Sequence, residues 1–314
     1  MERKEFILQS ESDALGISCL IIIPEEKPRA VLQIAHGMCG CKERYLPFME
    51  YMASHGVACI ANDHRGHGGS VRTSEDLGYM YGGGYEALAA DMKMVFEYMA
   101  KSCPAVPFYL LGHSMGALAS IISARQWGGE LSGLILCGIP YYKPVFHNSY
   151  SLLASLCHSG KGRLRLNIFQ EAGSAGFNRR FADEGPNAWV CSDAAVRQSF
   201  LDNPKCNFSF TLNGYMNLMG MLTSVYSSDM WINANLPNRI MMLSGADDPC
   251  TSYGKSLDAV YLLMNSYCMN ELDIRKLFYP HMRHEVLNEK DKEKVWNDIL
   301  FFVTLTDPVK VGPF

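Results

Sequence analysis

The sequence predicts an α/β protein with a mostly parallel sheet covered by helices on both faces. Three observations support this fold class. Short apolar segments typical of buried strands alternate with amphipathic helices near both ends of the chain. The alternation stops over residues 141–236 and then resumes. A serine flanked by glycines lies where one predicted strand meets a predicted helix, at 112–116.

Eight apolar segments are predicted to be strands. The first two form an antiparallel pair, because turn residues separate them, and the later ones suit a sheet buried on both faces. The expected strands are 6–9, 17–23, 30–35, 57–61, 108–111, 131–137, 239–243 and 272–278.

Helices are predicted at 45–55, 86–99 and 292–305, where apolar residues recur with helical spacing. Further helices are expected at 214–226 and 252–267, and directly after Ser114, where a helix-favouring run follows. The segment 141–236 interrupts the alternation between the sixth and seventh strands, which is typical of a mainly helical lid. We therefore expect a core in two parts, 1–140 and 237–314, and a lid (cap) insertion at 141–236.

Composition excludes several classes of function. The net charge is −4 without a basic run, so nucleic-acid binding has no electrostatic support.

The 11 cysteines lack paired spacing, and the charged N-terminus is not followed by the apolar segment of a signal peptide. We expect a cytoplasmic protein with free thiols, and Cys39 and Cys41 are interpreted as loop thiols, not metal ligands. Segment 17–23 is too short to span a bilayer.

The sequence GHSMG at 112–116 predicts a nucleophile elbow, with Ser114 in a strained turn and glycines where side chains would collide with neighbouring chain. A serine hydroxyl needs a base to remove its proton, and the base needs a third group to orient it. The partners are expected in the order acid, then histidine, after later strands.

Candidates for both partners follow the last two predicted strands. Asp247 is the preferred acid; Asp248 is the alternative, although the following proline restricts its backbone. His284 is the preferred base, and His281 is an alternative that position alone does not exclude.

Backbone N–H groups are predicted to stabilise the oxyanion of a tetrahedral intermediate. One belongs to Met115, directly after the serine, and the other to Met38, in the loop after the third strand. Gly37 permits a tight path for that loop, and His36 is interpreted as a structural histidine.

These motifs resemble the α/β-hydrolase superfamily and, within it, the monoacylglycerol lipase/lysophospholipase-like serine hydrolases. The matching segments are 36–38, 62–68, 112–116, 245–247 and 283–289. The resemblance implies a triad of Ser114, Asp247 and His284, thereby selecting Asp247 over Asp248 and His284 over His281. It also implies that the histidine-containing segment 63–68 is a structural loop.

The resulting hypothesis is a serine carboxylic-ester hydrolase that acts on a small-molecule acyl ester or monoacyl lipid through an acyl-enzyme. We expect no cofactor, no metal, no nucleic-acid partner and at most peripheral membrane contact through the lid. Apolar lid residues are expected to supply the acyl pocket: Leu152, Leu153, Leu156, Phe169, Phe177, Leu218, Met219, Met221 and Leu222.

Two alternatives remain. An aminopeptidase or amidase of the same fold would need acidic lid groups to hold a substrate amine, and the candidates are Glu171, Asp183, Glu184 and Asp193. A non-catalytic binding protein on a hydrolase scaffold is the other.

Overall fold

The computed structural model describes residues 1–166, 175–268 and 271–305. In these ranges eight strands form one sheet, in the order β1-β2-β4-β3-β5-β6-β7-β8. The β1–β2 and β2–β4 pairs are antiparallel and the remaining pairs are parallel, which confirms the predicted mostly parallel sheet. The strands are β1 (Glu2–Gln9), β2 (Gly16–Ile23), β3 (Ala30–Ala35), β4 (Val57–Asn62), β5 (Phe108–His113), β6 (Gly133–Cys137), β7 (Arg239–Gly245) and β8 (Asp273–Tyr279).

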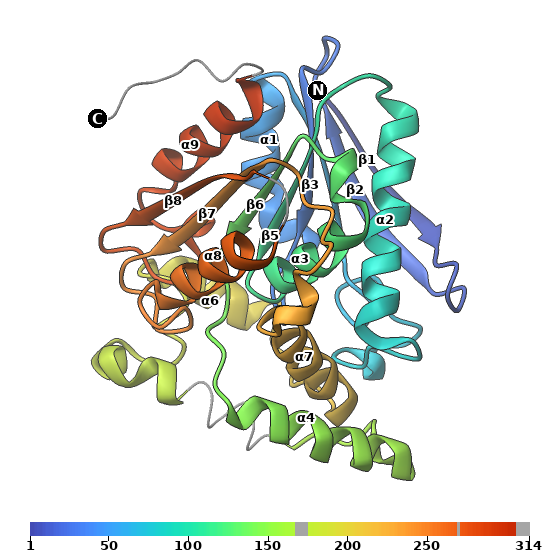
Figure 1. Ribbon diagram of the computed structural model, residues 1–314, viewed down its shortest axis with the longest axis vertical. Helices are drawn as coiled ribbons and strands as arrows, with labels where there is room; N and C mark the ends of the chain where they lie inside the picture. Colours follow the sequence, from blue (N-terminus) through green and yellow to red (C-terminus); the bar gives the residue numbers. More distant parts are fainter. Residues whose placement is uncertain (167–174, 269–270, 306–314) are drawn as a thin grey trace.

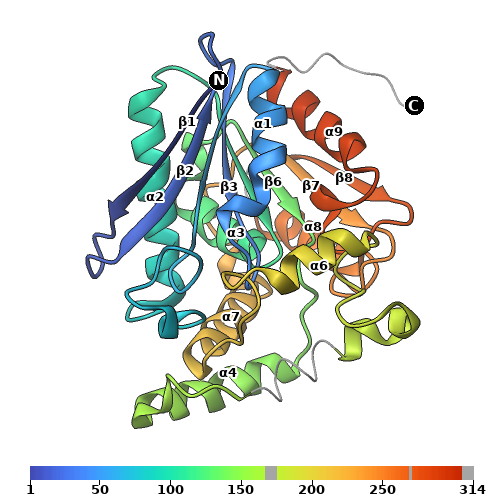
Figure 2. The same ribbon diagram turned by 180° about the vertical axis from the view of Figure 1, so that it is seen from behind.

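Helices cover both faces of the sheet (Figures 1 and 2). Helices α1 (Leu46–Ser54) and α9 (Lys292–Thr304) pack on one face. Helices α2 (Gly84–Ser102), α3 (Met115–Trp127) and α8 (Lys255–Tyr267) pack on the other. All five were expected from the sequence.

The packing of the central strand β3 shows why its sequence is apolar except for Gln33. Leu32 and Ile34 join the cluster under α1 and α9, whereas Val31 and Ala35 join the cluster under α2 and α3. Because successive strand side chains point to opposite faces, a strand covered on both sides loses the alternation of polar and apolar residues.

The chain between β6 and β7 contains α4 (Val145–Leu156), α6 (Ala194–Asp202) and α7 (Leu212–Val225). Of these, only α7 was located by the sequence. Helix α7 packs on α3, and α4 packs on α7, so that α4 lies at the end of the molecule away from the sheet (Figure 1). The division of the chain into two core parts and a lid stays a prediction.

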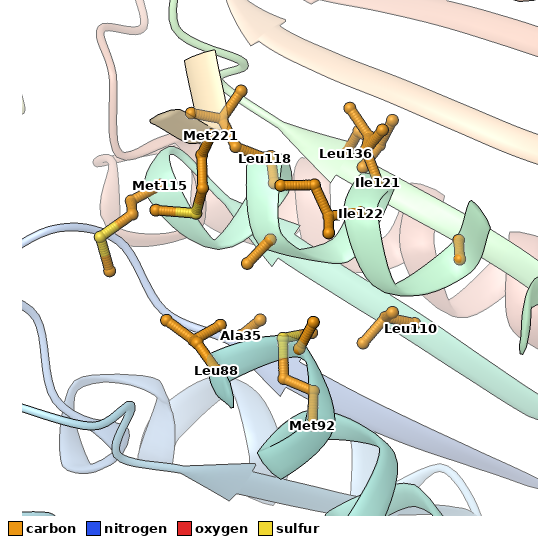
Figure 3. Close-up of a cluster of buried hydrophobic side chains, with 14 of the residues drawn as sticks. Ala35, Leu88, Met92, Leu110, Met115, Leu118, Ile121, Ile122, Leu136 and Met221 are labelled. Atoms are coloured by element: carbon orange, nitrogen blue, oxygen red, sulfur yellow. The ribbon is translucent and has the colours of Figure 1, made fainter. Parts of the chain in front are cut away.

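Helix α7 is built into the main core. Figure 3 shows its Met221 beside Leu118 of α3, in a cluster that also contains Met115, Leu88 and Met92. In α4, by contrast, only Leu153 is buried. The insertion therefore has one helix fixed by apolar packing and one that is mostly exposed.

Short helical turns complete the described structure. They are η1 (Lys42–Tyr45), η2 (Ser74–Asp76), η3 (Gly128–Glu130), η4 (Cys157–Lys161), η5 (Arg179–Glu184), η6 (Ser228–Met230) and η7 (Val286–Asn288).

The eleven cysteines are all unpaired, with the Sγ atoms of Cys41 and Cys206 3.5 Å apart. No helix within residues 1–166, 175–268 and 271–305 is both long and apolar enough to cross a bilayer.

Candidate active site

Ser114 lies at the junction of β5 and α3 with a strained backbone, φ 55° and ψ −119°. A positive φ is costly for a residue with a side chain and persists only where the surroundings impose it. Here the Ser114 N–H donates to the Cys137 carbonyl (2.9 Å), and the Ser114 carbonyl accepts from the Ala117 N–H (2.9 Å). These bonds hold the predicted elbow in place.

The two glycines of the elbow are required by close chain approach. A Cβ on Gly112 would collide with the Gly116 carbonyl, and a Cβ on Gly116 would collide with the Ala35 carbonyl of β3. These obstacles are backbone atoms, which cannot rotate away as a flexible side chain can. The contacts agree with the sequence-based explanation that side chains at these two positions would collide with neighbouring chain.

His284, in the loop after β8, contacts the serine. Its Nε2 lies 2.8 Å from the Ser114 Oγ, and its Nδ1 lies 2.8 Å from the Oδ2 of Asp248. His284 is 4% exposed. His281, the alternative base, is exposed in the turn that follows β8. The structure therefore brings Ser114 and His284 together as predicted.

The choice of Asp247 over Asp248 was wrong. Asp247 forms an ion pair with Arg180 of the insertion (2.9 Å), and a quarter of its side chain is exposed. Its N–H donates to the Met282 carbonyl (3.0 Å), which places the backbone, not the carboxylate, against the histidine loop.

Asp248 is fully buried, and a turn directs its side chain inward. The Asp248 N–H donates to the Gly245 carbonyl (3.2 Å), and its carbonyl accepts from Tyr253 (2.8 Å). Its second oxygen, Oδ1, accepts from the Cys250 N–H (2.8 Å). Both carboxylate oxygens therefore have donors, so the group stays oriented toward His284.

The Asp248 carboxylate determines the charge behaviour of His284. Burial disfavours the imidazolium, but the charge and hydrogen bond of Asp248, with a smaller effect of Glu285, outweigh it and raise the pKa of His284. A carboxylate at Nδ1 selects the tautomer with its proton on Nδ1. Nε2 is then free to accept the proton of the Ser114 hydroxyl.

His113, the second residue of the GHSMG motif, contacts the histidine that is the candidate base. Its Nε2–H donates to the His284 carbonyl (3.1 Å), and the two rings lie 4.8 Å apart. Burial, together with the nearby His284, lowers the pKa of His113 to about 4, so it is neutral near pH 7. Sequence reasoning had assigned it no role.

The two proposed oxyanion donors lie on segments that meet at Ser114. A Cβ built on Gly37 would be 3.1 Å from the Ser114 Cβ, so the loop of Met38 abuts the serine. Within the described ranges neither the Met38 N–H nor the Met115 N–H donates a hydrogen bond. The Met115 side chain is buried in the core (Figure 3), so only its backbone N–H is a candidate for the role predicted from the sequence.

A cluster of buried histidines shapes the Gly37 loop. The Nδ1–H of His36 donates to the Gly37 carbonyl (2.8 Å), and its Nε2 accepts from the His64 N–H (2.9 Å). Burial and the neighbouring histidines lower the pKa of His36 well below its usual range. Both nitrogens have partners, which confirms His36 as a structural residue.

Residues 178–192 of the insertion lie over the histidine loop, which the sequence did not predict. The guanidinium of Arg283 donates to the Ala188 carbonyl (2.6 Å) and to Glu184 (2.5 Å). It also lies 3.9 Å from the ring centroid of Phe181. The ring of Trp189 lies 5.2 Å from that of the catalytic histidine candidate. The one hint in the sequence is the arginine directly before His284.

Within the described part of the insertion, the three acids predicted from the sequence do not gather into one site. Glu184 pairs with Arg283, Asp193 accepts from Ala195 at the start of α6, and Asp183 is exposed. Glu171 lies outside the described residues. The described acids therefore lend no support to the aminopeptidase hypothesis.

The apolar residues expected to form the acyl pocket differ in burial. Leu153, Met221 and Leu222 are buried in the core, and Leu152 is largely exposed. Partly buried against the same core are Leu156, Leu218 and Met219. Phe177 packs on Trp189, with ring centroids 4.8 Å apart, and is thus near the site. Phe169 lies outside the described residues.

The chain is similar to known proteins in both sequence and fold. A family model described as serine aminopeptidase, S33, matches residues 26–291. The chain is 27% identical to human monoglyceride lipase over 125 residues, 40% of each protein. It is 28% identical to the monoacylglycerol lipase of Mycolicibacterium smegmatis over 135 residues, 41% of this chain and 46% of that protein. These matches span less than half the length of either relative.

A solved structure matches nearly the whole chain. The carboxyl esterase of Bacillus coagulans, crystallised in complex with glycerol, superposes with a TM-score of 0.89 at 26% identity. The match covers 97% of this chain and 100% of that one. The fold is therefore that of the α/β-hydrolases, as the sequence predicted.

Proposed function

The chain belongs to the serine aminopeptidase S33 family, and from this membership we propose that it is a serine hydrolase of carboxylic esters. Ser114 is the nucleophile, His284 the general base and Asp248 the acid that orients it. The observation that carries the proposal is the continuous chain Ser114 Oγ–His284 Nε2 and His284 Nδ1–Asp248 Oδ2, 2.8 Å at each step.

The geometry supports an acyl-enzyme mechanism. Nε2 of His284 takes the hydroxyl proton as the Ser114 Oγ attacks the ester carbonyl, and Asp248 stabilises the imidazolium. The Met38 and Met115 N–H groups donate to the developing oxyanion. The imidazolium then passes its proton to the departing alcohol, and water releases the acid by the same steps in reverse order.

The proposed substrate is a small acyl ester or monoacyl lipid. Two relatives are a monoglyceride lipase and a monoacylglycerol lipase, and a nearly full-length structural neighbour is an esterase crystallised with glycerol. The apolar side chains of the insertion would hold the acyl chain, because binding sites for such groups are mostly apolar.

The test compares Ser114→Ala with Ser123→Ala, a buried serine on the same helix but outside the site. We expect Ser114→Ala to lower kcat for 1-octanoylglycerol and p-nitrophenyl octanoate by at least about 10⁴-fold. Ser123→Ala should retain activity within a few-fold. A fluorophosphonate probe should label the wild type and Ser123→Ala only.

Two results would contradict the proposal. Undiminished ester hydrolysis by Ser114→Ala would exclude the mechanism. Faster turnover of amino-acid 4-nitroanilides than of both esters would favour an aminopeptidase, the activity that the family description names.

A further inference from the structure

Glu285, the residue directly after His284, brings a second buried carboxylate to the site. It forms an ion pair with the guanidinium of Arg44, and the two side chains are only 11% and 10% exposed. The Nδ2–H of Asn288 donates to the same carboxylate oxygen, Oε2 (3.1 Å). The steps proposed for ester hydrolysis use neither of these two charges.

The ion pair connects segments that carry groups of the proposed mechanism. Arg44 belongs to η1, which follows the loop of Met38 after β3, and Glu285 belongs to the loop after β8. The Glu285 N–H also donates to the Val190 carbonyl of the insertion (2.8 Å). The pair therefore lies where η1, the histidine loop and the insertion contact one another.

A second part of the insertion covers the pair. The ring centroid of Phe200 in α6 lies 4.9 Å from the guanidinium carbon of Arg44. A buried ion pair is often no more stabilising than apolar side chains of similar volume, so stability alone does not explain two charges at this place.

The charge of Arg44 keeps Glu285 ionised. Burial raises the pKa of a carboxyl group, but here the guanidinium, with smaller effects of neighbouring groups, outweighs burial and lowers the pKa of Glu285. The carboxylate is therefore negative over the pH range in which a histidine titrates. Its charge acts on the adjacent imidazole in the same direction as that of Asp248, toward a higher pKa of His284.

The titratable groups that face His284 come from several elements. The Asp248 carboxylate lies at Nδ1 and the Ser114 hydroxyl at Nε2, each 2.8 Å away. The ring of His113 lies 4.8 Å from that of His284, and its lowered pKa, about 4, leaves it neutral near pH 7. Among the described residues, Asp248 and Glu285 are therefore the charged groups that favour the imidazolium.

We propose that Glu285 is a positioning residue that acts through His284: its carboxylate, held by Arg44, adds a second negative charge that stabilises the imidazolium formed when His284 takes the serine proton. This inference rests on the proposed ester-hydrolase function and adds a residue to its mechanism. Asp248 contacts the imidazole, whereas Glu285 acts from a greater distance, so its effect on the rate is the smaller one.

The test follows kcat/KM for p-nitrophenyl octanoate across the acid limb of the pH profile. In Glu285→Gln the amide oxygen can still accept from Arg44 and Asn288, but the negative charge is lost. We expect the acid limb to move to lower pH by about half a pH unit, and kcat/KM above the limb to fall about threefold.

The matched control is Glu289→Gln, in the same loop. Glu289 is also buried and accepts from the N–H groups of Ser192 (2.8 Å) and Arg283 (2.9 Å), but it does not contribute to the pKa of His284. This variant reproduces the structural loss of a buried carboxylate and should leave the acid limb in place. Equal shifts in both variants, or no shift in Glu285→Gln, would overturn the proposal.

Two variants of Arg44 test the same charge without changing the histidine loop, and they decide the question if Glu285→Gln does not fold. Arg44→Lys retains a cation, so the acid limb should stay near that of the wild type. In Arg44→Gln burial is unopposed and raises the pKa of Glu285, so the carboxyl group takes up a proton and the acid limb should move to lower pH. An acid limb that stays in place or moves to higher pH in Arg44→Gln would overturn the proposal.

The proposed function fails in a different way, namely if Ser114→Ala hydrolyses the ester like the wild type. Fluorophosphonate labelling of Glu285→Gln above the acid limb, at a rate within a few-fold of the wild type, would show that Ser114 and His284 stay in place. Labelling lost altogether in a folded Glu285→Gln would overturn the proposal, because the residue would then be needed to assemble the site.

Discussion

Two adjacent aspartates follow β7, and the geometry of the turn decides which carboxylate contacts the histidine. Asp247 and Asp248 are adjacent, both acidic and both follow β7. The turn closed by the Asp248 N–H and the Gly245 carbonyl directs the second side chain inward and the first toward Arg180. The proline after Asp248, which counted against it, is compatible with this turn.

This difference predicts opposite outcomes for two conservative variants. Asp248→Asn should lower kcat by about 10³- to 10⁴-fold, because an amide cannot stabilise the imidazolium or select the productive tautomer. Asp247→Asn should stay within a few-fold of the wild type, because it loses only a half-exposed ion pair. The measurement is kcat for p-nitrophenyl octanoate, and a larger loss in Asp247→Asn would restore the original choice.

The pH profile provides a check on the same variants. The base must be neutral, and the raised pKa of His284 places the acid limb of kcat/KM above the usual imidazole value of 6.5. In Asp248→Asn burial is no longer opposed by that carboxylate, so the residual activity should extend to lower pH.

At the scale of elements, the loop after β4 depends on a buried ion pair. Asp63 accepts from the Lys42 Nζ (3.0 Å) and from the N–H groups of Lys42 and Gly69 (2.8 Å each). The Asp63 side chain is fully buried and that of Lys42 is 2% exposed. The pair connects the loop that contains His64 to the turn that follows the Met38 loop.

We predict that Asp63→Asn lowers the free energy of unfolding by about 3 kcal/mol, because it leaves a buried ammonium group with only a partial partner in Glu43. The matched control is Asp258→Asn, which breaks an exposed pair with Lys276 and should change stability by less than about 1 kcal/mol. Urea unfolding of both variants measures the difference. Equal effects would contradict the structural role of the pair.

Two parts of the insertion differ in how firmly they are attached to the core. Residues 178–192 are tied to the loops of the acid and the histidine through Arg180, Arg283 and the contact of Ser192 with Glu289. Helix α4 packs on α7 and buries Leu153 alone. Segments with few buried contacts open most readily. Helix α4 is therefore expected to open more readily than residues 178–192.

At the scale of the whole molecule, buried neutral histidines make stability depend on pH. Burial lowers the pKa of His64 to about 3, and those of His67 and His113 to about 4. His36 is shifted in the same direction. In the unfolded chain these groups titrate near 6.5, so the unfolded state binds more protons below that pH.

Stability from these histidines is therefore fully present above pH 6.5 and lost as the pH falls toward about 4. His284 acts in the opposite sense, because its raised pKa favours the folded state until the pH rises through it. Each of the four neutral histidines loses roughly 2 kcal/mol of stabilisation between pH 7 and pH 5, and His284 offsets only part of this loss. We therefore expect the free energy of unfolding to fall by several kcal/mol over this range.

Urea unfolding at pH 7, 6 and 5 tests this. His67→Phe should reduce the loss by the share of one histidine, because the ring would still pack on Phe208 and Phe210 without titrating. A loss of stability unchanged in this variant, or absent in the wild type, would contradict the prediction.

Much of the fold could be predicted because its elements depend on local pattern. The eight strands and the helices that cover the sheet follow from apolar runs and from 3.6-residue periodicity. In the insertion, α4 and α6 were not located from the sequence. Little of either helix is buried in the structure, namely Leu153 alone in α4 and no residue in α6. Trp189 escaped prediction because nothing local to it indicates a partner almost a hundred residues away.

By itself, the sequence determined the α/β fold, the elbow at Ser114, the glycines around it and the histidine at 284, because each leaves a mark in local spacing or in strand order. Only the tertiary structure decided that Asp248 orients that histidine, that His113 supports it and that Trp189 covers it. The physical reason is that side-chain direction depends on turn geometry and on contacts between distant segments. Neither is encoded in the spacing of residue types along the chain.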